Sequence, residues 1–266
     1  MTDLPDLDVA AVRRFLDGAP RDLDLYNACC AYGWRFDGEN NFDSYSNGEL
    51  ALMRFALPHC RVAVDVGANR GRWIETALTI NPALALHAFE PSTATFALLV
   101  AAQFSPQVTL NQVALGERAE ERELFEFGGE PTSELRSLYK RAGAQDYQVT
   151  EPSGSERVAI TTLDRYCAEH GLASIDFLKI DTEGHDLRVL HGARELVARR
   201  AIRFVQFEYG PPNIDSRTWL KDFFDFFGGH GYALHKLHPS GYSHYPAYLA
   251  RLENFRYQNW VALRGD

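Results

Sequence analysis

The pattern of apolar and polar positions changes character near residue 60. Before that point, apolar residues at helical spacing predict two short helices, over residues 6–17 and 49–57. A loop that contains several glycines and asparagines separates them, and Pro58 marks the end of the second helix. We therefore expect residues 1–58 to form a small helical extension that precedes the core of the protein.

From residue 61 onward, short apolar strands alternate with helical segments, which is typical of a parallel sheet covered by helices on both faces. The predicted strands cover residues 61–66, 84–89, 108–113, 175–180 and 202–207. The predicted helices cover residues 73–79, 93–104, 163–170 and 186–199. Two later strands, over 232–238 and 259–264, suit an antiparallel pair that reverses one edge of the sheet.

A long polar segment interrupts this alternation. Residues 122–127 and 156–161 are typical of paired strands, and residues 128–155 between them are too long for a simple connection. A segment of this length is usually either a lid over a binding site or disordered, and we expect a lid. Because no repeat or linker divides the chain, we expect a single domain over residues 1–266, with the core in residues 59–266.

Composition and charge argue against a nucleic-acid-binding, disulfide-rich or membrane-spanning protein. The 266 residues include 27 Lys and Arg against 36 Asp and Glu, and the formal net charge of −9 disfavours nucleic acid or an anionic membrane as the main partner. Four cysteines without C-x-x-C spacing suit neither a disulfide framework nor a zinc site. No apolar run approaches the ~20 residues of a membrane span, and the acidic N-terminus does not resemble a secretory leader. We expect a soluble, cytoplasmic protein with a small or cationic ligand.

A glycine-containing turn follows the first predicted strand. Residues 64–71 read Val-Asp-Val-Gly-Ala-Asn-Arg-Gly and contain neither the G-x-G-x-x-G dinucleotide fingerprint nor the Gly-Lys-Ser/Thr of a P-loop. Asp65 disfavours a phosphate and favours a cationic ligand, although a carboxylate here also suits a helix cap. Gly67 permits positive φ and the close approach of a ligand to the backbone.

Glu90 ends the second predicted strand, where a carboxylate can accept hydrogen bonds from a ribose diol. Together with Asp65 and Gly67 it lies at the edge of the sheet where open α/β folds bind ligands. These residues outline a pocket for a nucleoside that carries a cationic tail and no phosphate. S-adenosylmethionine is the common cofactor of that description.

A longer motif surrounds the fourth predicted strand. Residues 175–193 read Ile-Asp-Phe-Leu-Lys-Ile-Asp-Thr-Glu-Gly-His-Asp-Leu-Arg-Val-Leu-His-Gly-Ala, which resembles the signature of the FkbM-type methyltransferases, a family of class I S-adenosylmethionine-dependent O-methyltransferases. Further blocks in that family's order lie at residues 64–71, 89–91, 113–116 and 162–164. The resemblance covers about residues 50–210.

This resemblance implies a fold and a cofactor site. The fold would be the Rossmann-like class I methyltransferase fold, α/β, with a seven-stranded, mostly parallel sheet and an antiparallel last strand. The residues that would bind S-adenosyl-L-methionine are Asp65, Gly67, Asn69, Gly71, Glu90, Ala114 and Asp181. Glu90 would hold the ribose hydroxyls, and Ala114 would border the adenine.

A hydroxyl acceptor needs a base, because it is a poor nucleophile at neutral pH. The candidates at the end of the fourth predicted strand are Asp181, Glu183 and His185. Glu208 ends the fifth predicted strand, where it would bind the acceptor. His185 is the natural base, because the reference pKa of histidine is the closest to neutrality. A solvated histidine in the first turn of a helix, without a catalytic role, is an equally good interpretation. Asp181 also suits a helix cap, and Glu183 also suits an orienting or structural role. The carboxylates of Asp181, Glu183 and Glu208 could together bind a magnesium ion, although the sequence contains no metal-binding motif of fixed spacing.

The expected acceptor is a hydroxylated small molecule such as a sugar, a glycolipid or a natural product. Histidines and tyrosines of residues 230–248 would border it, together with the 128–155 segment and the N-terminal extension. A non-catalytic binding or regulatory module is disfavoured by the ionisable residues after the fourth strand. An N-methyltransferase is disfavoured because no Asn/Asp-Pro-Pro-Tyr follows that strand. A homodimer is compatible with the sequence, which does not identify the acceptor.

Overall fold

The computed structural model describes residues 22–128, 136–141 and 151–265. The chain divides into two compact units, residues 1–37 and residues 38–266. In the first unit the described helix is α2 (Leu23–Asp37), which buries none of its residues. The helix predicted over residues 6–17 lies outside the described residues. Among the described helices, none is long and apolar enough to span a membrane.

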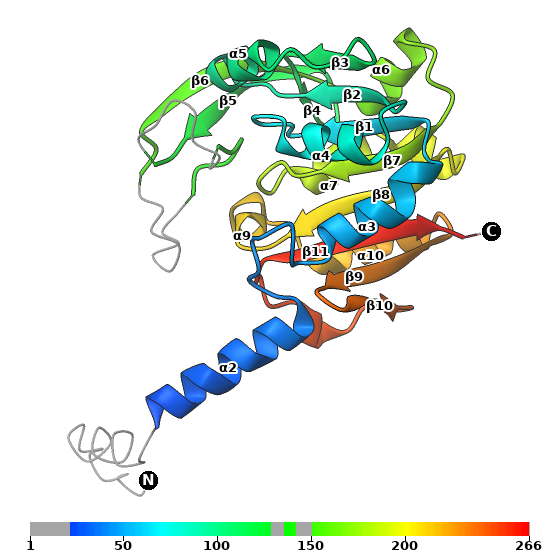
Figure 1. Cartoon of the computed structure of the whole chain (residues 1–266). Helices are drawn as coiled ribbons and strands as arrows, with labels where there is room; N and C mark the ends of the chain where they lie inside the picture. The colour runs from blue at the N-terminus through cyan, green and yellow to red at the C-terminus, as the bar shows by residue number, and fades with distance from the viewer. Residues whose placement is uncertain (1–21, 129–135, 142–150, 266) are drawn as a thin grey trace, which may run out of the picture. The chain divides into compact units, whose positions relative to one another are not determined.

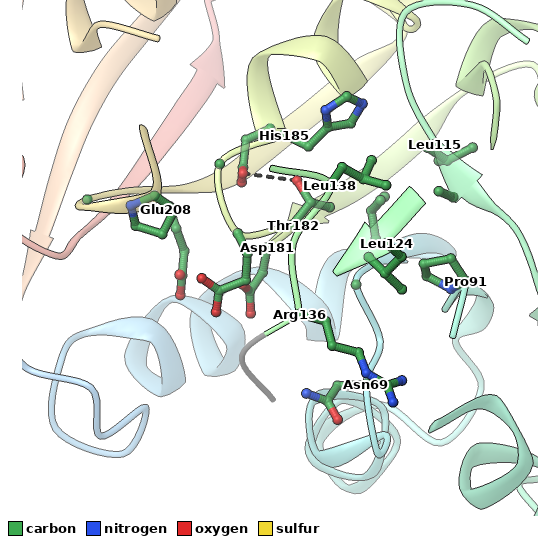
Figure 2. Close-up of a pocket in the computed structure, with 18 of the residues that line it drawn as sticks. Asn69, Pro91, Leu115, Leu124, Arg136, Leu138, Asp181, Thr182, His185 and Glu208 are labelled. Atoms are coloured by element: carbon green, nitrogen blue, oxygen red, sulfur yellow. Dashed lines mark hydrogen bonds between the residues drawn. The ribbon is translucent and has the colours of Figure 1, made fainter. Parts of the chain in front are cut away.

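The second unit is built on an eight-stranded sheet with the order β10-β9-β11-β8-β7-β1-β2-β3 (Figure 1). Its parallel strands are β1 (Val62–Val66), β2 (Ala85–Phe89), β3 (Val108–Asn111), β7 (Ile175–Ile180) and β8 (Ile202–Tyr209). These strands confirm the five predicted from apolar runs. Because they are parallel, their carboxyl ends meet at one edge of the sheet, around the pocket of Figure 2.

The main sheet has eight strands instead of the predicted seven, and the additional strand lies at its antiparallel end. This end consists of β9 (Tyr232–His238), β10 (Gly241–Tyr245) and β11 (Gln258–Arg264). As predicted, β9 and β11 pair antiparallel, and β11 lies between β8 and β9. The additional strand β10 forms a hairpin with β9 at the edge. None of its residues is fully buried, so it has no apolar run that would have revealed it.

A second sheet has three strands in the order β4-β6-β5. They are β4 (Ala114–Leu115), β5 (Glu120–Glu126) and β6 (Gly154–Thr161). The antiparallel pairing of β5 with β6 confirms the predicted pair, but we predicted one sheet where the structure has two. The second sheet forms because the chain leaves β3 at Asn111 and pairs β4 with β6 instead. Of the predicted 128–155 lid, residues 129–135 and 142–150 lie outside the described residues.

Helices cover both faces of the main sheet. One face carries α3 (Glu49–Ala56), α4 (Arg72–Ile80) and α5 (Thr93–Ala101). The other face carries α6 (Leu163–Glu169), α7 (Asp186–His191), α8 (Arg194–Ala198) and α10 (Leu220–Gly228). Among the residues that the structure describes, the short elements are α9 (Pro212–Ser216) and two 3-10 helices, η1 (Leu57–His59) and η3 (Ala250–Leu252).

The single helix predicted over residues 186–199 is two helices, α7 and α8. The carboxylate of Asp164 accepts hydrogen bonds from the backbone N–H groups of Glu195 and Leu196, at 2.9 and 3.0 Å, and thereby caps the start of α8. Gly192 ends α7 and lies so close to Gly116 that a Cβ would stand 1.9 Å from its carbonyl oxygen. These distant contacts divide a helix that the local pattern predicts as continuous.

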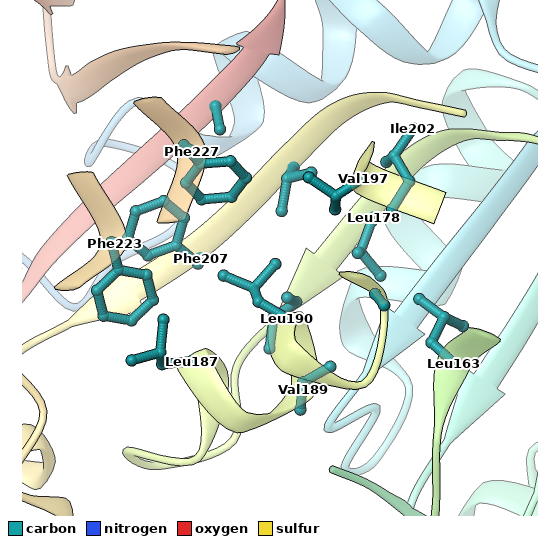
Figure 3. Close-up of a cluster of buried hydrophobic side chains, with 14 of the residues drawn as sticks. Leu163, Leu178, Leu187, Val189, Leu190, Val197, Ile202, Phe207, Phe223 and Phe227 are labelled. Atoms are coloured by element: carbon teal, nitrogen blue, oxygen red, sulfur yellow. The ribbon is translucent and has the colours of Figure 1, made fainter. Parts of the chain in front are cut away.

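Alternate residues of the central strands serve the two faces of the sheet. Val64 and Val66 of β1 belong to the large core beneath α7 and α10, part of which is drawn in Figure 3. Ala63 belongs to the core beneath α3 and α4. Asp65 shares the face of Ala63, because side chains alternate along a strand. A carboxylate is thus buried within the sheet, directly below the edge where the strand ends converge.

Candidate active site

A cavity of about 480 Å³ lies at the carboxyl ends of β1, β2, β7 and β8. One part of its lining is apolar: Val66, Phe89, Pro91, Val113, Ala114, Leu115, Leu124 and Leu138. Another part is acidic: Glu90, Asp181, Glu183, Asp186, Glu208 and Asp215. Figure 2 shows the apolar wall on one side of the cavity and the carboxylates of Asp181 and Glu208 on the other. A concave, largely apolar site with a few convergent polar groups is typical of small-molecule binding.

The structure brings most of the predicted site residues to this cavity. Those that line it are Gly67, Asn69, Glu90, Ala114, Asp181, Glu183, His185 and Glu208. Asp65 and Gly71 do not. Gly71 has a φ of +84° and precedes α4, and a Cβ there would lie 2.5 Å from the ring of Phe104. Its position is therefore explained by the turn into α4 and by packing beneath it.

Asp65 lies beneath the cavity, with no exposed surface. The Nζ of Lys179 lies 3.2 Å from Oδ1 of Asp65 and 3.2 Å from Oδ2 of Asp181, and it donates a hydrogen bond to the carbonyl of Gly67 at 3.3 Å. Burial raises the pKa of Asp65, while the charge of Lys179 opposes this rise. The N-cap residue of α4 is Gly71, and the carboxylate of Asp65 faces Lys179 instead, so Asp65 is not the helix cap that the sequence allowed. Through Lys179 it ties the end of β1 to that of β7.

Gly67 is the point at which three strand ends meet. Its φ is +82°, and a Cβ there would lie 1.9 Å from the carbonyl oxygen of Asp181. Its N–H donates to the carbonyl of Phe89 at 3.0 Å. The close approach that we expected from a ligand is therefore made by the protein's own backbone. Glycine is needed here for the floor of the cavity to form at all.

Glu90 presents a buried carboxylate to the cavity. Its Oε2 accepts a hydrogen bond from the N–H of Asn69 at 3.0 Å, and its Oε1 accepts one from the N–H of Ser92 at 2.9 Å. Burial raises the pKa of Glu90 to about 7, while these two donors oppose the rise. Because each oxygen has a second acceptor position, the carboxylate can still receive two hydroxyl donors. Within the described residues, the buried Oδ1 of the neighbouring Asn69 has no hydrogen-bond partner.

Glu208 lies opposite, at the end of β8. Its Oε1 accepts a hydrogen bond from the hydroxyl of Tyr257 at 2.6 Å, and that hydroxyl accepts one from the Nδ2 of Asn259 at 3.0 Å. Burial and the charge of Asp181 raise the pKa of Glu208 well above its ordinary value, while the Tyr257 hydroxyl opposes the rise. This end of the cavity therefore favours a proton or a cationic group.

Glu183 follows β7 in a tight turn, with a φ of +53°. Its Oε2 lies 2.5 Å from Nη2 of Arg141, and its carbonyl accepts a hydrogen bond from the hydroxyl of Ser137 at 2.9 Å. Burial raises the pKa of Glu183 to about 7, while Arg141 opposes the rise. Glu183 is thus already engaged by the segment that follows β5.

His185 is buried, with 3% of its surface exposed, so the reading as a solvated histidine is wrong. Its Nδ1 lies 2.8 Å from the hydroxyl of Tyr139. Burial, and then the charges of Arg122 and Arg188, lower the pKa of His185 to about 3. The imidazole is therefore neutral at pH 7 and a weak base.

Two of the carboxylates that left a magnesium site open face basic side chains. Among the residues that the structure describes, no group of three or more His, Cys, Asp or Glu side chains is placed to hold a metal ion. Asp181 and Glu183 are instead directed toward Lys179 and Arg141.

Several residues that line the cavity were not identified from the sequence: Phe42, Arg136, Arg141 and Tyr257. Arg136 is 8% exposed, and its guanidinium donates hydrogen bonds to Thr95 and Glu126 at 2.9 and 2.8 Å. These residues belong to no local motif, because they come from segments that precede, interrupt or follow the βα units. The only local signal was the position of the two arginines within the long segment after β5.

Most of the chain, including the strand ends that form the cavity, matches a known protein family. Residues 65–238 match the family model described as methyltransferase FkbM domain. The chain is 30% identical to the 31-O-demethyl-FK506 methyltransferase FkbM of Streptomyces tacrolimicus, over 50% of this chain and 60% of that protein. It is 26% identical to the 2-O-methyltransferase NoeI of Sinorhizobium fredii (strain NBRC 101917 / NGR234), over 56% of this chain and 63% of that protein. The chain thus spans less than two thirds of the length of these curated relatives.

Among solved structures, the methyltransferase FkbM from Methylobacillus flagellatus KT is similar to this chain with a TM-score of 0.48 and 14% sequence identity. The similarity covers 76% of this chain and 43% of that one.

Proposed function

The chain belongs to the FkbM methyltransferase family, and from this premise we propose that it is an S-adenosylmethionine-dependent O-methyltransferase that acts on a hydroxyl group of a small molecule, such as a sugar, a glycolipid or a natural product. The observation that carries the proposal is Glu90, a buried carboxylate at the end of β2 that two backbone N–H groups hold against the cavity. The names of two relatives, a 31-O-demethyl-FK506 methyltransferase and a 2-O-methyltransferase, support oxygen as the acceptor atom.

The residues at the cavity fit the cofactor. Glu90 would accept hydrogen bonds from the ribose hydroxyls, and Ala114 would border the adenine within the apolar wall. Gly67 and Asn69 would surround the methionine end, where the unpartnered Oδ1 of Asn69 can accept a hydrogen bond. The carboxylate of Asp181 suits a cationic sulfonium nearby. S-adenosylmethionine supplies an activated methyl group when it is bound.

Glu208, which we expected to bind the acceptor, is better placed than the three candidate bases to receive the proton of an acceptor hydroxyl. Asp181 is ion-paired with Lys179, and Glu183 is ion-paired with Arg141. Over the described ranges, no ion pair involves Glu208, and one of its two oxygens is held by a tyrosine hydroxyl. A fixed carboxylate with a raised pKa is suited to general base catalysis, which contributes roughly 10²–10⁴-fold to a rate.

Calorimetric titration of the protein with S-adenosylhomocysteine, without added metal, tests the cofactor site. We expect binding by the wild-type protein and a loss of about 100-fold or more in affinity for Glu90→Ala, since two hydrogen bonds to a charged group disappear. The matched control is Glu75→Ala, on the exposed face of α4, which should bind like the wild type. Absence of binding by the wild-type protein would overturn the proposal.

Transfer of a radiolabelled methyl group to a panel of hydroxylated compounds, with and without EDTA, tests the reaction. We expect label in an alkali-stable ether in both conditions. Cofactor binding without transfer to any hydroxyl, or transfer to amines alone, would favour the binding-module or N-methyltransferase alternatives instead.

A further inference from the structure

Two aromatic residues from outside the family-matched region line the cavity together. Phe42 precedes residues 65–238 and Tyr257 follows them, yet their ring centroids are only 4.5 Å apart. Phe42 is 65% exposed, so most of its ring surface is available for contact. An aromatic ring exposed at the rim of a cavity offers a flat apolar surface whose face carries partial negative charge.

The position of Phe42 is fixed by the residues just before it. The N–H of Asn40 donates to the carbonyl of Tyr257 at 2.9 Å, and the N–H of Tyr257 donates to Oδ1 of Asn40 at 3.2 Å. Glu39 is buried, with its carboxylate 2.8 Å from Nζ of Lys236 and 3.2 Å from a guanidinium nitrogen of Arg256. A buried charge is costly unless it is fully paired, so this anchor holds the segment in one place.

One member of this aromatic pair, Tyr257, contacts Glu208, the proposed base. The Tyr257 hydroxyl donates to Glu208, and the carboxylates of Glu208 and Asp181 lie on the same side of the cavity, opposite the apolar wall (Figure 2). Carboxylates repel an anionic group, so this side of the cavity disfavours a phosphorylated or carboxylated acceptor. The exposed ring of Phe42 and the carboxylate of Glu208 are therefore both available to an uncharged acceptor at this cavity.

We propose that Phe42 and Tyr257 form the acceptor subsite, and that this subsite takes an uncharged, ring-shaped hydroxyl compound whose C–H face packs on Phe42 while a hydroxyl is directed to Glu208. This inference rests on the proposed function and adds the residues that select the acceptor. Acceptor selection then resides in the segments that flank the family-matched region, whereas the cofactor contacts come from the strand ends within it.

Saturation-transfer NMR on the full chain, in the presence of S-adenosylhomocysteine, tests the subsite with two defined probes. They are methyl β-D-glucopyranoside, which is neutral, and methyl β-D-glucopyranosiduronate, which has the same ring and a carboxylate. We expect transfer to the ring protons of the neutral probe, a signal at least about 5-fold weaker for the anionic probe, and a similar loss in Phe42→Ala. The matched control is Phe55→Ala, another exposed aromatic residue that does not line the cavity.

The two proposals fail in different ways. No transfer from the wild-type protein to the glucopyranoside, an equal signal from the uronate, or an unchanged signal in Phe42→Ala would overturn the acceptor subsite. Titration of the same samples with S-adenosylhomocysteine should give the wild-type affinity for Phe42→Ala, which also shows that the variant is folded. Failure of the wild-type protein to bind S-adenosylhomocysteine would overturn the proposed function itself.

Discussion

The ammonium group of Lys179 lies 3.2 Å from the carboxylate of Asp65, and both side chains are buried within the main sheet. Burial alone would lower the pKa of Lys179, but the charges of Asp181 and Asp65 outweigh it and raise the pKa, so the lysine stays charged. The pair joins neighbouring strands at the edge where the cavity forms. The floor of the cavity therefore depends on a buried ion pair whose two residues do not line the cavity themselves.

Removing the cation should destabilise the fold. Lys179→Met leaves Asp65 buried without its counter-charge, and we expect the free energy of unfolding to fall by about 3–5 kcal/mol. Urea unfolding measures this change. Lys221→Met is the control, because Lys221 is exposed and paired with Asp225 on the surface of α10, where we expect a loss of about 0.5 kcal/mol or less. Equal losses in the two variants would contradict the structural importance of the buried pair.

Replacing Gly67 by alanine tests the convergence of the strand ends. The φ of +82° costs an L residue about 1–2 kcal/mol, and displacement of the Asp181 carbonyl adds roughly 1–3 kcal/mol more. Gly171 has a similar φ of +67°, but nothing lies within 4 Å of the position of an added Cβ. Gly171→Ala therefore measures the backbone cost of a positive φ alone. Urea unfolding should rank Gly67→Ala as clearly the less stable variant. A similar stability for both would show that the close approach is relieved at little cost.

Asp186 should make stability fall as pH rises. Burial and the charge of Asp181 raise its pKa from 3.8 to about 6, while the hydroxyl of Thr182 opposes the rise. A folded pKa above the unfolded one stabilises the protein fully below pH 3.8, and this contribution is lost as pH rises through about 6. Asp186→Asn cannot lose a proton there, so its free energy of unfolding relative to wild type should rise by about 2 kcal/mol between low and neutral pH.

Urea unfolding at pH 4.5 and 7.5 checks this dependence, with Asp225→Asn as the exposed control. Asp225 lies on the surface of α10, where we expect the difference from wild type to change little between the two pH values. A difference for Asp186→Asn that stays constant, or that shrinks with rising pH, would contradict the direction of the pKa shift.

Tyr257→Phe should change the pH profile of methyl transfer. The Tyr257 hydroxyl opposes the rise in the pKa of Glu208, so its removal should raise that pKa and move the acid limb of kcat to higher pH. On the acid limb we expect kcat to be about 10-fold lower than in the wild type and to recover as the pH is raised, with an unchanged KM for S-adenosylmethionine. Tyr248→Phe is the control, since Tyr248 donates to Glu253 and does not line the cavity. A uniform loss at all pH values would contradict this role.

The side of the cavity formed by the ends of β1 and β2, where we propose the cofactor binds, was the more predictable one. The strand that ends at Phe89 and the glycine turn after Val66 are local patterns, and a parallel sheet brings their ends to one edge by its topology alone. Glu90 was therefore placed at the cavity by its position in the sequence. The surroundings of His185 were not predictable, because its burial depends on Tyr139 from the segment after β5.

The sequence by itself determined the positions of the five parallel strands along the chain, the glycine turn and the placement of Glu90 at a strand end, because each follows from residues adjacent in the chain. Only the tertiary structure decided that Asp65 pairs with Lys179, that Gly67 meets the backbone of Asp181, and that Phe42 stands beside Tyr257. These contacts join distant segments, and their geometry is fixed by burial and charge pairing. The pattern along the chain reports which face a residue occupies, but not which partner it meets there.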